Sequence, residues 1–258
     1  MARQRVPEGP PPAPAVQKLR IRYARRGRLR FSSTRDFSRA LERALRRSGV
    51  PMAFSAGFHP HQKISYAGAA PTGAASEAEY FEIQVTQRVD PEALRAALDE
   101  ALPDGLDILE VVEAGPGSLA ERLQGSQWRM EFAGVESTLL AEAVAALRSA
   151  GTAEVTRTFK TGPKTFDVLA AVVDLRVEEA NAGPAAAPSG PPCAILTLVV
   201  RSTTPTVRPD DVLTALRAVA GFAPPRPPRV TRLAQGPIDD ASAGVADPLA
   251  ADRDAAGS

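Results

Sequence analysis

A short loop holds both histidines of the chain, and a lysine follows them. The three residues are His59, His61 and Lys63. A pair of histidines can act as general acid and general base near neutral pH, and a lysine can hold a phosphate or a developing oxyanion. These side chains are therefore the candidate catalytic residues. The reaction that they would support is a metal-independent, endoribonuclease-like cleavage.

The other residues of this loop favour contact with a ligand. Gly57 permits unusual backbone angles and a close approach of the ligand, and the rings of Phe58 and Tyr66 could stack on a nucleobase. Three interpretations remain open for the loop: catalysis, ligand binding without catalysis, and a rigid turn whose histidines bond only to backbone groups. Whether the protein is an enzyme stays open with them.

Basic residues are concentrated in one early segment. Residues 18–47 contain twelve of the 31 Lys and Arg residues and two acids, a net charge of +10, whereas the remaining residues carry 19 bases and 28 acids, a net charge of −9. The planar fork of arginine matches phosphate oxygens, and a basic surface can follow an RNA backbone. The arginines predicted to bind nucleic acid are Arg20, Arg22, Arg28, Arg30, Arg35, Arg39, Arg43, Arg46 and Arg47. The alternative is an ordinary solvated strand and helix face.

Composition excludes several classes of site. Cys193 is the only cysteine, so an internal disulfide, an iron–sulfur cluster and a multi-thiolate zinc site are excluded. We predict no metal and no cofactor. No apolar run reaches the length of a membrane span, and the first residues do not resemble a secretory signal. We therefore expect a cytoplasmic protein that does not bind membranes.

Periodicity predicts the elements that carry these residues. Apolar and basic residues alternate over 18–23, which predicts a half-buried strand with Tyr23 inside. Residues 25–28 read as a turn. The alternation resumes at Leu29 and Phe31, with Phe31 predicted to point inward, so a hairpin would extend the basic row.

A helix is predicted next. Ser33 can cap it, with Asp36 three residues later in a capping-box arrangement, and Gly49 and Pro51 end it. The predicted apolar face comprises Phe37, Leu41, Ala44 and Leu45. The opposite face carries Arg35, Arg39, Arg43, Arg46 and Arg47.

The order of elements predicts two α+β domains in tandem, each ferredoxin-like (βαββαβ). The pattern runs over 17–113 and recurs over 127–235, with a linker at 114–126. A Pro/Ala hairpin insertion is predicted at 180–192. Both ends of the chain, 1–16 and 236–258, are poor in apolar residues, and we predict that they are disordered tails.

Several motifs resemble a bacterial family. They are Arg28-Leu29-Arg30-Phe31-Ser32-Ser33, the segment from Arg39 to Pro51, Gly57-Phe58-His59-Pro60, and Ser76-Glu77-Ala78-Glu79-Tyr80. Together they resemble the radical SAM-linked (radical SAM-associated) family, a domain of unknown function. Because the cluster cysteines are absent, the chain resembles the stand-alone form of that domain. A looser, architectural likeness is to the CRISPR repeat endoribonucleases with two ferredoxin-like domains.

Two functions follow as hypotheses. The first is an RNA-binding protein that acts in tRNA or rRNA maturation or modification, and the resemblance implies that a radical SAM enzyme works alongside it. The second is an accessory subunit that docks on such an enzyme without binding RNA.

Overall fold

The structure, a computed structural model, describes residues 12–179 and 191–256. It divides into two compact units, one formed by the chain up to Ala120 together with the segment from Leu249 onward, the other by Glu121–Pro248. Each unit is described by itself below. Two predicted segments lie outside the described residues. They are the first eleven residues of the N-terminal tail and most of the insertion at 180–192, namely 180–190.

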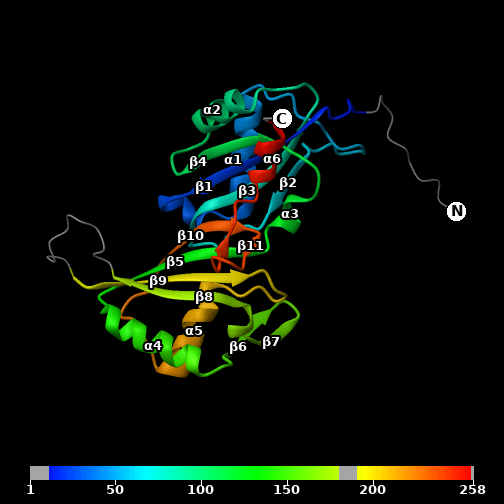
Figure 1. The fold of residues 1–258 in the computed structure, drawn as a ribbon. Helices are drawn as coiled ribbons and strands as arrows, with labels where there is room; N and C mark the ends of the chain where they lie inside the picture. Colours follow the sequence, from blue (N-terminus) through cyan, green and yellow to red (C-terminus); the bar gives the residue numbers. More distant parts are fainter. Residues whose placement is uncertain (1–11, 180–190, 257–258) are drawn as a thin grey trace. The chain divides into compact units, whose positions relative to one another are not determined.

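The first unit contains a four-stranded antiparallel sheet and two long helices (Figure 1). Its elements are β1 (Gln17–Arg25), a 3-10 helix η1 (Gly27–Phe31), α1 (Thr34–Arg47), β2 (Ile64–Ala67), β3 (Ala75–Val85), α2 (Pro91–Ala101) and β4 (Leu106–Glu113). Strand β1 lies between β3 and β4, and β2 pairs with β3, so the order within this unit is β4-β1-β3-β2.

One face of this sheet forms the core with α1 and α2. Alternation along β1 turns Leu19, Ile21 and Tyr23 to this side, and all three are buried. Tyr23 stacks on Phe37 of α1 with ring centroids 4.2 Å apart. The predicted inward position of Tyr23 and the predicted apolar face of the helix are therefore confirmed.

The start of α1 follows the capping-box prediction. The Ser33 hydroxyl accepts from the Asp36 amide at 3.2 Å, and the Asp36 carboxylate accepts from the Ser33 amide at 3.2 Å. These two bonds satisfy amide groups that have no partner inside the helix. The side-chain and backbone hydrogen bonds from Ser33 lower the pKa of Asp36.

The predicted hairpin after β1 is wrong. Residues 27–31 form η1 and lead straight into α1. Gly27 makes this possible at the end of the strand because its φ of 54° lies in the left-handed region. Phe31, expected inside, is 59% exposed. The alternation at 28–31 was therefore misleading, since a single short turn does not distinguish a strand from a 3-10 helix.

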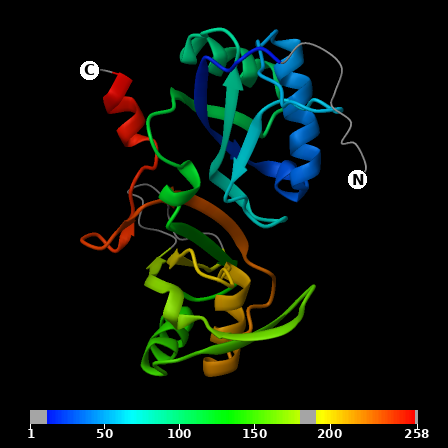
Figure 2. The ribbon, with the colours of Figure 1, turned by 90° about the vertical axis from the view of Figure 1, so that its right-hand side faces the viewer.

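The predicted disordered C-terminal tail is also wrong over the residues that the structure describes. This segment forms β11 (Ile238–Asp239), β12 (Gly244–Val245) and α6 (Ala250–Ala256). Figure 2 shows α6 on the face of the first unit's sheet opposite α1. Asp252 of this helix is 1% exposed. Its burial depends on a partner far away in the sequence, which composition does not reveal.

The second unit repeats the same order of pairing. Its elements are α3 (Leu119–Arg122), which begins just before the unit, β5 (Gly125–Ala133), α4 (Ser137–Ser149), β6 (Glu154–Phe159), β7 (Gly162–Asp167), a 3-10 helix η2 (Leu169–Ala171), β8 (Val172–Glu179), β9 (Cys193–Arg201), α5 (Pro209–Ala220) and β10 (Arg229–Gly236). The pairs β10–β5, β5–β9 and β9–β8 are antiparallel. Strands β6 and β7 form a separate hairpin inserted before β8. The α+β class predicted from the sequence is confirmed.

Candidate functional site

The basic residues of 18–47 do not form one surface. Five of the twelve are held by neighbouring groups of the first unit, and the other seven belong to η1 and α1. The held residues are Lys18, Arg20, Arg22, Arg25 and Arg26. The expected single basic patch is therefore not formed. A smaller basic patch remains, and it lies on a helix rather than on the sheet.

Arg20 was predicted to bind nucleic acid, and its position contradicts this. Its side chain is fully buried, 2.6 Å from Asp252 and 3.0 Å from Glu82. The same guanidinium donates to the Gly117 carbonyl oxygen at 2.5 Å. Burial alone would lower the pKa of Arg20, but hydrogen bonds to Asp252 and Glu82 outweigh that effect and raise it. Arg20 is a charged structural residue that no polyanion can reach.

Its neighbour Arg22 is also engaged. The Arg22 guanidinium donates from Nε to the Glu77 carbonyl oxygen at 2.9 Å, and its side chain is only partly exposed. The Glu77 carboxylate in turn forms an ion pair with Arg26. Arg22 is therefore a weaker candidate for nucleic-acid binding than the arginines of the helix.

Arg25 fixes the loop that precedes β3. It is 3% exposed, and its Nη2 donates to the carbonyl oxygens of Ala70 and Pro71 at 3.0 Å and of Ala74 at 3.3 Å. Several carbonyl dipoles aimed at one guanidinium stabilise its charge inside the unit. This arginine holds a loop rather than a ligand.

The exposed face of α1 carries the remaining cluster, which we call the α1 arginine face. Its members are Arg35, Arg39, Arg43, Arg46 and Arg47, all exposed. Among the described residues, no carboxylate forms an ion pair with any of them within 4.0 Å. At 3.6 residues per turn, the first four lie within roughly 80° of each other and span roughly 16 Å along the axis.

The amphipathic pattern of α1 explains why these arginines face water. The side chains buried against the sheet are Phe37, Leu41, Ala44 and Leu45, which lie on the opposite side of the helix. Arg46 and Arg47 also lie in the last turn, where positive charge is favourable beside the helix carbonyl groups. The sequence predicted this face correctly.

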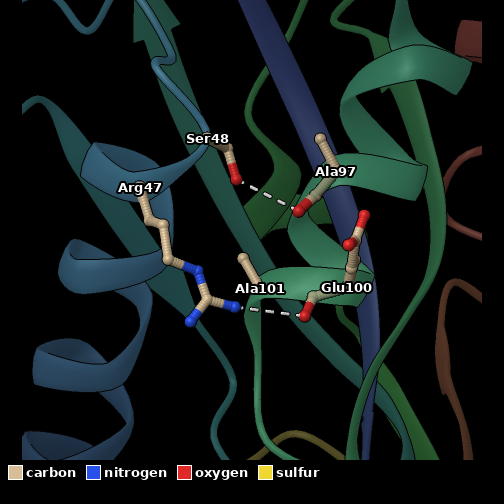
Figure 3. Close-up of a pocket in the computed structure, with 5 residues that line it drawn as sticks. All are labelled: Arg47, Ser48, Ala97, Glu100 and Ala101. Atoms are coloured by element: carbon tan, nitrogen blue, oxygen red, sulfur yellow. Dashed lines mark hydrogen bonds between the residues drawn. The ribbon is translucent and has the colours of Figure 1, made fainter.

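Arg47 has a second contact, which closes a small pocket. Its Nη2 donates to the Glu100 carbonyl oxygen at 3.3 Å, and Ser48 Oγ donates to the Ala97 carbonyl oxygen at 3.0 Å (Figure 3). The pocket, about 240 Å³, is lined by these four residues and Ala101. The two side chains bond to carbonyl oxygens near the end of α2. The pocket is therefore a gap where α1 packs against α2 rather than a ligand site.

Two further arginines lie on η1. Arg28 is exposed and Arg30 half-buried, and the Arg30 guanidinium lies 4.5 Å from the centroid of the exposed Phe31 ring. A cation over an exposed ring is an arrangement that also suits a nucleobase and a phosphate. These two predicted residues remain candidates for ligand contact.

The histidine loop is a small hairpin that precedes β2. Phe54 and Gln62 form a β-bridge, and the Ser55 amide donates to the His61 carbonyl oxygen at 2.9 Å. His61 Nδ1 lies 2.8 Å from Ser55 Oγ, so His61 closes the base of the loop. His59, at the tip, is exposed.

The predicted catalytic groups do not form a hydrogen-bonded cluster. Among the described residues, neither histidine has a carboxylate partner, and no hydrogen bond joins His59, His61 and Lys63. A base normally needs an orienting partner and a reacting group within hydrogen-bond reach. The hairpin therefore offers exposed polar groups for binding more readily than an assembled acid–base pair.

Two of the loop residues predicted to contact nucleic acid are well placed for it. Phe58 is 59% exposed at the tip of the hairpin. Gly57 adopts a φ of 128°, and a Cβ there would meet no atom within 4 Å, so the backbone is open to a ligand.

Tyr66 is not suited to stacking on a base. Its ring packs against Phe37 and Phe81 with centroids 6.0 and 6.4 Å away. Its hydroxyl donates to Ser38 Oγ at 2.9 Å. Burial raises the pKa of the Tyr66 hydroxyl, although the Ser38 hydrogen bond opposes this. The predicted contact of Tyr66 with nucleic acid is replaced by a structural role.

A second pocket lies beside the histidine hairpin. It has a volume of about 350 Å³, and its walls include His61, Lys63, Lys18 and Glu82. Lys18 and Glu82 form an ion pair of 2.8 Å across it. Gln62 also lines the pocket, and its Oε1 is buried without a hydrogen-bond partner. The pocket lining thus combines Lys63 with the Lys18–Glu82 ion pair, a polar lining that sequence spacing did not reveal.

No group of three or more His, Cys, Asp or Glu side chains is arranged to hold a metal ion in residues 12–179 and 191–256. Within the same ranges, none of the helices combines the length and the apolar character that crossing a membrane requires.

The fold and the site thus define an α+β protein with an exposed arginine face and a polar histidine hairpin. The chain belongs to a family described as uncharacterized protein conserved in bacteria (DUF2344), whose model matches residues 18–209. No curated protein matches the chain. The family description names no activity, so function has to be argued from the site.

Proposed function

We propose that this protein binds RNA through the α1 arginine face and acts in the maturation or modification of tRNA or rRNA. The observation that carries the proposal is the absence of any carboxylate ion pair to Arg35, Arg39, Arg43, Arg46 and Arg47 among the described residues. The same unit pairs Arg26 with Glu77 and Asp107.

The chemistry of the face favours phosphate over other anions. Each guanidinium presents a planar set of donors that can engage two phosphate oxygens at once. A row of roughly 16 Å matches an extended backbone better than a single small anion. RNA is favoured over a compact ligand for this reason.

The histidine hairpin supplies the second part of the proposed interface. Phe58 at its tip can stack on an unpaired base, while His59 and Lys63 offer donors to phosphate or ribose. The hairpin acts as a binding element in this proposal. Cleavage of RNA by His59, His61 and Lys63 is the further step that the activity assay below would reveal.

The resemblance of the motifs to radical SAM-linked proteins adds a partner to the proposal. A radical SAM enzyme would carry out the chemistry on the RNA that this chain holds. The common order of antiparallel pairing in the two units further supports reading both as ferredoxin-like, an architecture that many RNA-binding proteins share.

A pair of charge reversals tests the RNA proposal. The variant Arg39→Glu with Arg43→Glu changes the α1 arginine face, and the variant Arg217→Glu with Arg226→Glu makes the same change of net charge on exposed residues of the second unit. We expect the first variant to lose at least tenfold in affinity for a tRNA or rRNA fragment, and the control to lose much less. Equal losses, or none, would reject the α1 arginine face as the binding surface. Incubation of the wild-type protein with the same RNA, without added metal, measures cleavage.

The second candidate function is an accessory subunit that docks on a radical SAM enzyme without RNA. The exposed rings of Phe31, Phe54 and Phe58, which are 59%, 41% and 59% exposed, favour it, because aromatic side chains are enriched at protein interfaces. Co-purification with and without ribonuclease separates the two candidates. An identified radical SAM enzyme that remains bound after ribonuclease treatment favours docking, and its release favours RNA as the link.

A further inference from the structure

The hairpin of β6 and β7 is an element that the proposed RNA surface does not use. It is a two-stranded ribbon separate from the sheet of the second unit. Figure 2 shows it extending away from α4 and α5 of that unit. Each strand has six residues, and a turn of two residues, Lys160 and Thr161, joins them. Six residues of β-strand extend roughly 20 Å.

The two faces of this ribbon differ in chemistry. Cross-strand partners point to the same face, and the pairs Arg157–Lys164, Phe159–Gly162 and Val155–Phe166 alternate with the others. One face therefore interleaves cations with aromatic rings. The other face carries threonines, where Thr156 Oγ1 and Thr165 Oγ1 lie 2.7 Å apart.

Arg157 anchors the ribbon and positions its rings. Its guanidinium forms an ion pair with the buried Asp211 and donates to the Thr206 carbonyl oxygen at 2.9 Å. The same guanidinium lies 4.7 Å from the centroid of Phe159 and 5.2 Å from that of Phe166. Because Asp211 compensates its charge, Arg157 organises the aromatic residues and is not itself a free cation.

The cations at the far end of the ribbon are free. Lys160 and Lys164 are both exposed, and within the described part of the chain no carboxylate forms an ion pair with either. Lys164 Nζ lies 5.7 Å from the centroid of the half-buried Phe159 ring. The sequence from 155 to 166 contains no acid. This end of the ribbon is therefore complementary to a polyanion that also offers flat, apolar surfaces.

We infer that the β6–β7 hairpin binds single-stranded RNA, with Phe159 stacking on an unpaired base and Lys160 and Lys164 contacting the flanking phosphates. Stacking selects single strands, because the bases of a duplex are covered by their neighbours. The ribbon thus adds a second stacking ring, besides Phe58, to an interface whose α1 arginine face recognises phosphate alone. The inference rests on the proposed function, since it names the form of RNA that the protein takes.

The experiment compares two RNAs and six proteins: four that test the inference and two controls, Thr158→Ala and Phe159→Trp. The RNAs are a single strand of about 12 nucleotides and the duplex of the same sequence. The four test proteins are the full-length wild type, Phe159→Ala, Lys160→Gln with Lys164→Gln, and Arg39→Glu with Arg43→Glu. Thr158→Ala is the matched control, because Thr158 is an exposed residue on the opposite face of the same ribbon. Thermal unfolding of each variant verifies that it is folded, and Phe159→Trp keeps a stacking ring in place.

We expect Phe159→Ala to weaken binding of the single strand about tenfold and binding of the duplex less than twofold. The lysine variant weakens both, Phe159→Trp and Thr158→Ala retain binding, and the α1 variant weakens both RNAs alike. If the α1 variant loses RNA while the hairpin variants bind as the wild type does, the hairpin inference fails and the proposed function survives. Loss in the hairpin variants alone would support the hairpin and reject the α1 arginine face. Absence of binding by the wild type would overturn both.

Discussion

Arg20 and Asp252 form an ion pair of 2.6 Å, although 232 residues separate them in the sequence, and the side chains of both are fully buried. Asp252 Oδ1 also accepts from the Gly115 amide at 2.9 Å. The pair connects the first strand of the chain with its last helix. Within the first unit, α6 thereby covers the face of the sheet that the core helices leave open (Figure 2).

Removal of the carboxylate should destabilise the first unit. We expect Asp252→Ala to cost about 3 kcal/mol of the free energy of unfolding, because it leaves a buried guanidinium with one partner fewer. Urea denaturation followed by circular dichroism measures this. Hydrogen exchange should show faster exchange of the amides in 249–256.

An exposed ion pair serves as the control for this change. Arg88 and Glu113 lie 2.6 Å apart, but their side chains are 67% and 38% exposed, so Arg88→Ala should cost less than about 1 kcal/mol. If Asp252→Ala lowers the free energy of unfolding as little as Arg88→Ala does, then the contacts of Asp252 contribute little to the stability of the unit. A double variant, Arg20→Met with Asp252→Leu, should recover part of the loss, because neither charge remains buried, whereas the Gly115 amide and the Gly117 carbonyl oxygen lose their partners.

The salt dependence of RNA binding provides the second prediction. The variant Arg35→Gln, Arg39→Gln and Arg43→Gln should reduce the slope of log affinity against log salt by about 2, since each lost phosphate contact removes about 0.7 for a single strand. Titrations at several salt concentrations measure the slope. A lower affinity with an unchanged slope would show that these side chains act through something other than phosphate contacts. Glutamine is a good helix former, so the helix itself should persist.

Tyr66 separates a structural role from RNA binding. Tyr66→Phe should cost about 1 kcal/mol of the free energy of unfolding, because the hydrogen bond to Ser38 is lost. RNA affinity should not change. Ser38→Ala removes the same bond while keeping the tyrosine, and a comparable loss of stability is expected. Weaker RNA binding in Tyr66→Phe would contradict the structural role of the half-buried ring.

The same tyrosine predicts a dependence on alkaline pH. Burial raises the pKa of Tyr66 in the folded state, so the folded protein binds its proton more tightly than the unfolded chain does. The contribution to stability is fully present below the unfolded pKa and is lost as the pH rises through the folded pKa. The difference in unfolding free energy between wild type and Tyr66→Phe should therefore shrink above about pH 10. A constant difference up to higher pH would rule out this linkage.

The fifth prediction concerns the histidine hairpin. Phe58→Ala and His59→Ala should each weaken RNA binding about fivefold, while the free energy of unfolding stays within about 0.5 kcal/mol, because both side chains are exposed at the tip. Ser55→Ala is the control: it removes the hydrogen bond to His61 but no group at the tip. If only Ser55→Ala affects binding, the loop acts through its rigidity rather than through its tip.

Local patterns in the sequence were sufficient for several elements. The alternation in 18–23 identified β1 and the inward position of Tyr23, and Ser33 with Asp36 marked the start of α1. These predictions succeeded because strand period, helix period and capping depend on residues a few positions apart. The 3-10 helix at 27–31 was missed for the same reason, since four alternating residues fit more than one local structure.

The sequence by itself determined the α+β class, the cap and faces of α1, and the composition of the basic segment. Only the tertiary structure decided which charges remain free. Arg20 and Arg39 have the same side chain and lie in the same segment, yet the fold buries Arg20 against Asp252 and leaves Arg39 in water. Charge is a property of the residue, whereas the availability of that charge to a ligand depends on groups that only folding brings within a few ångströms.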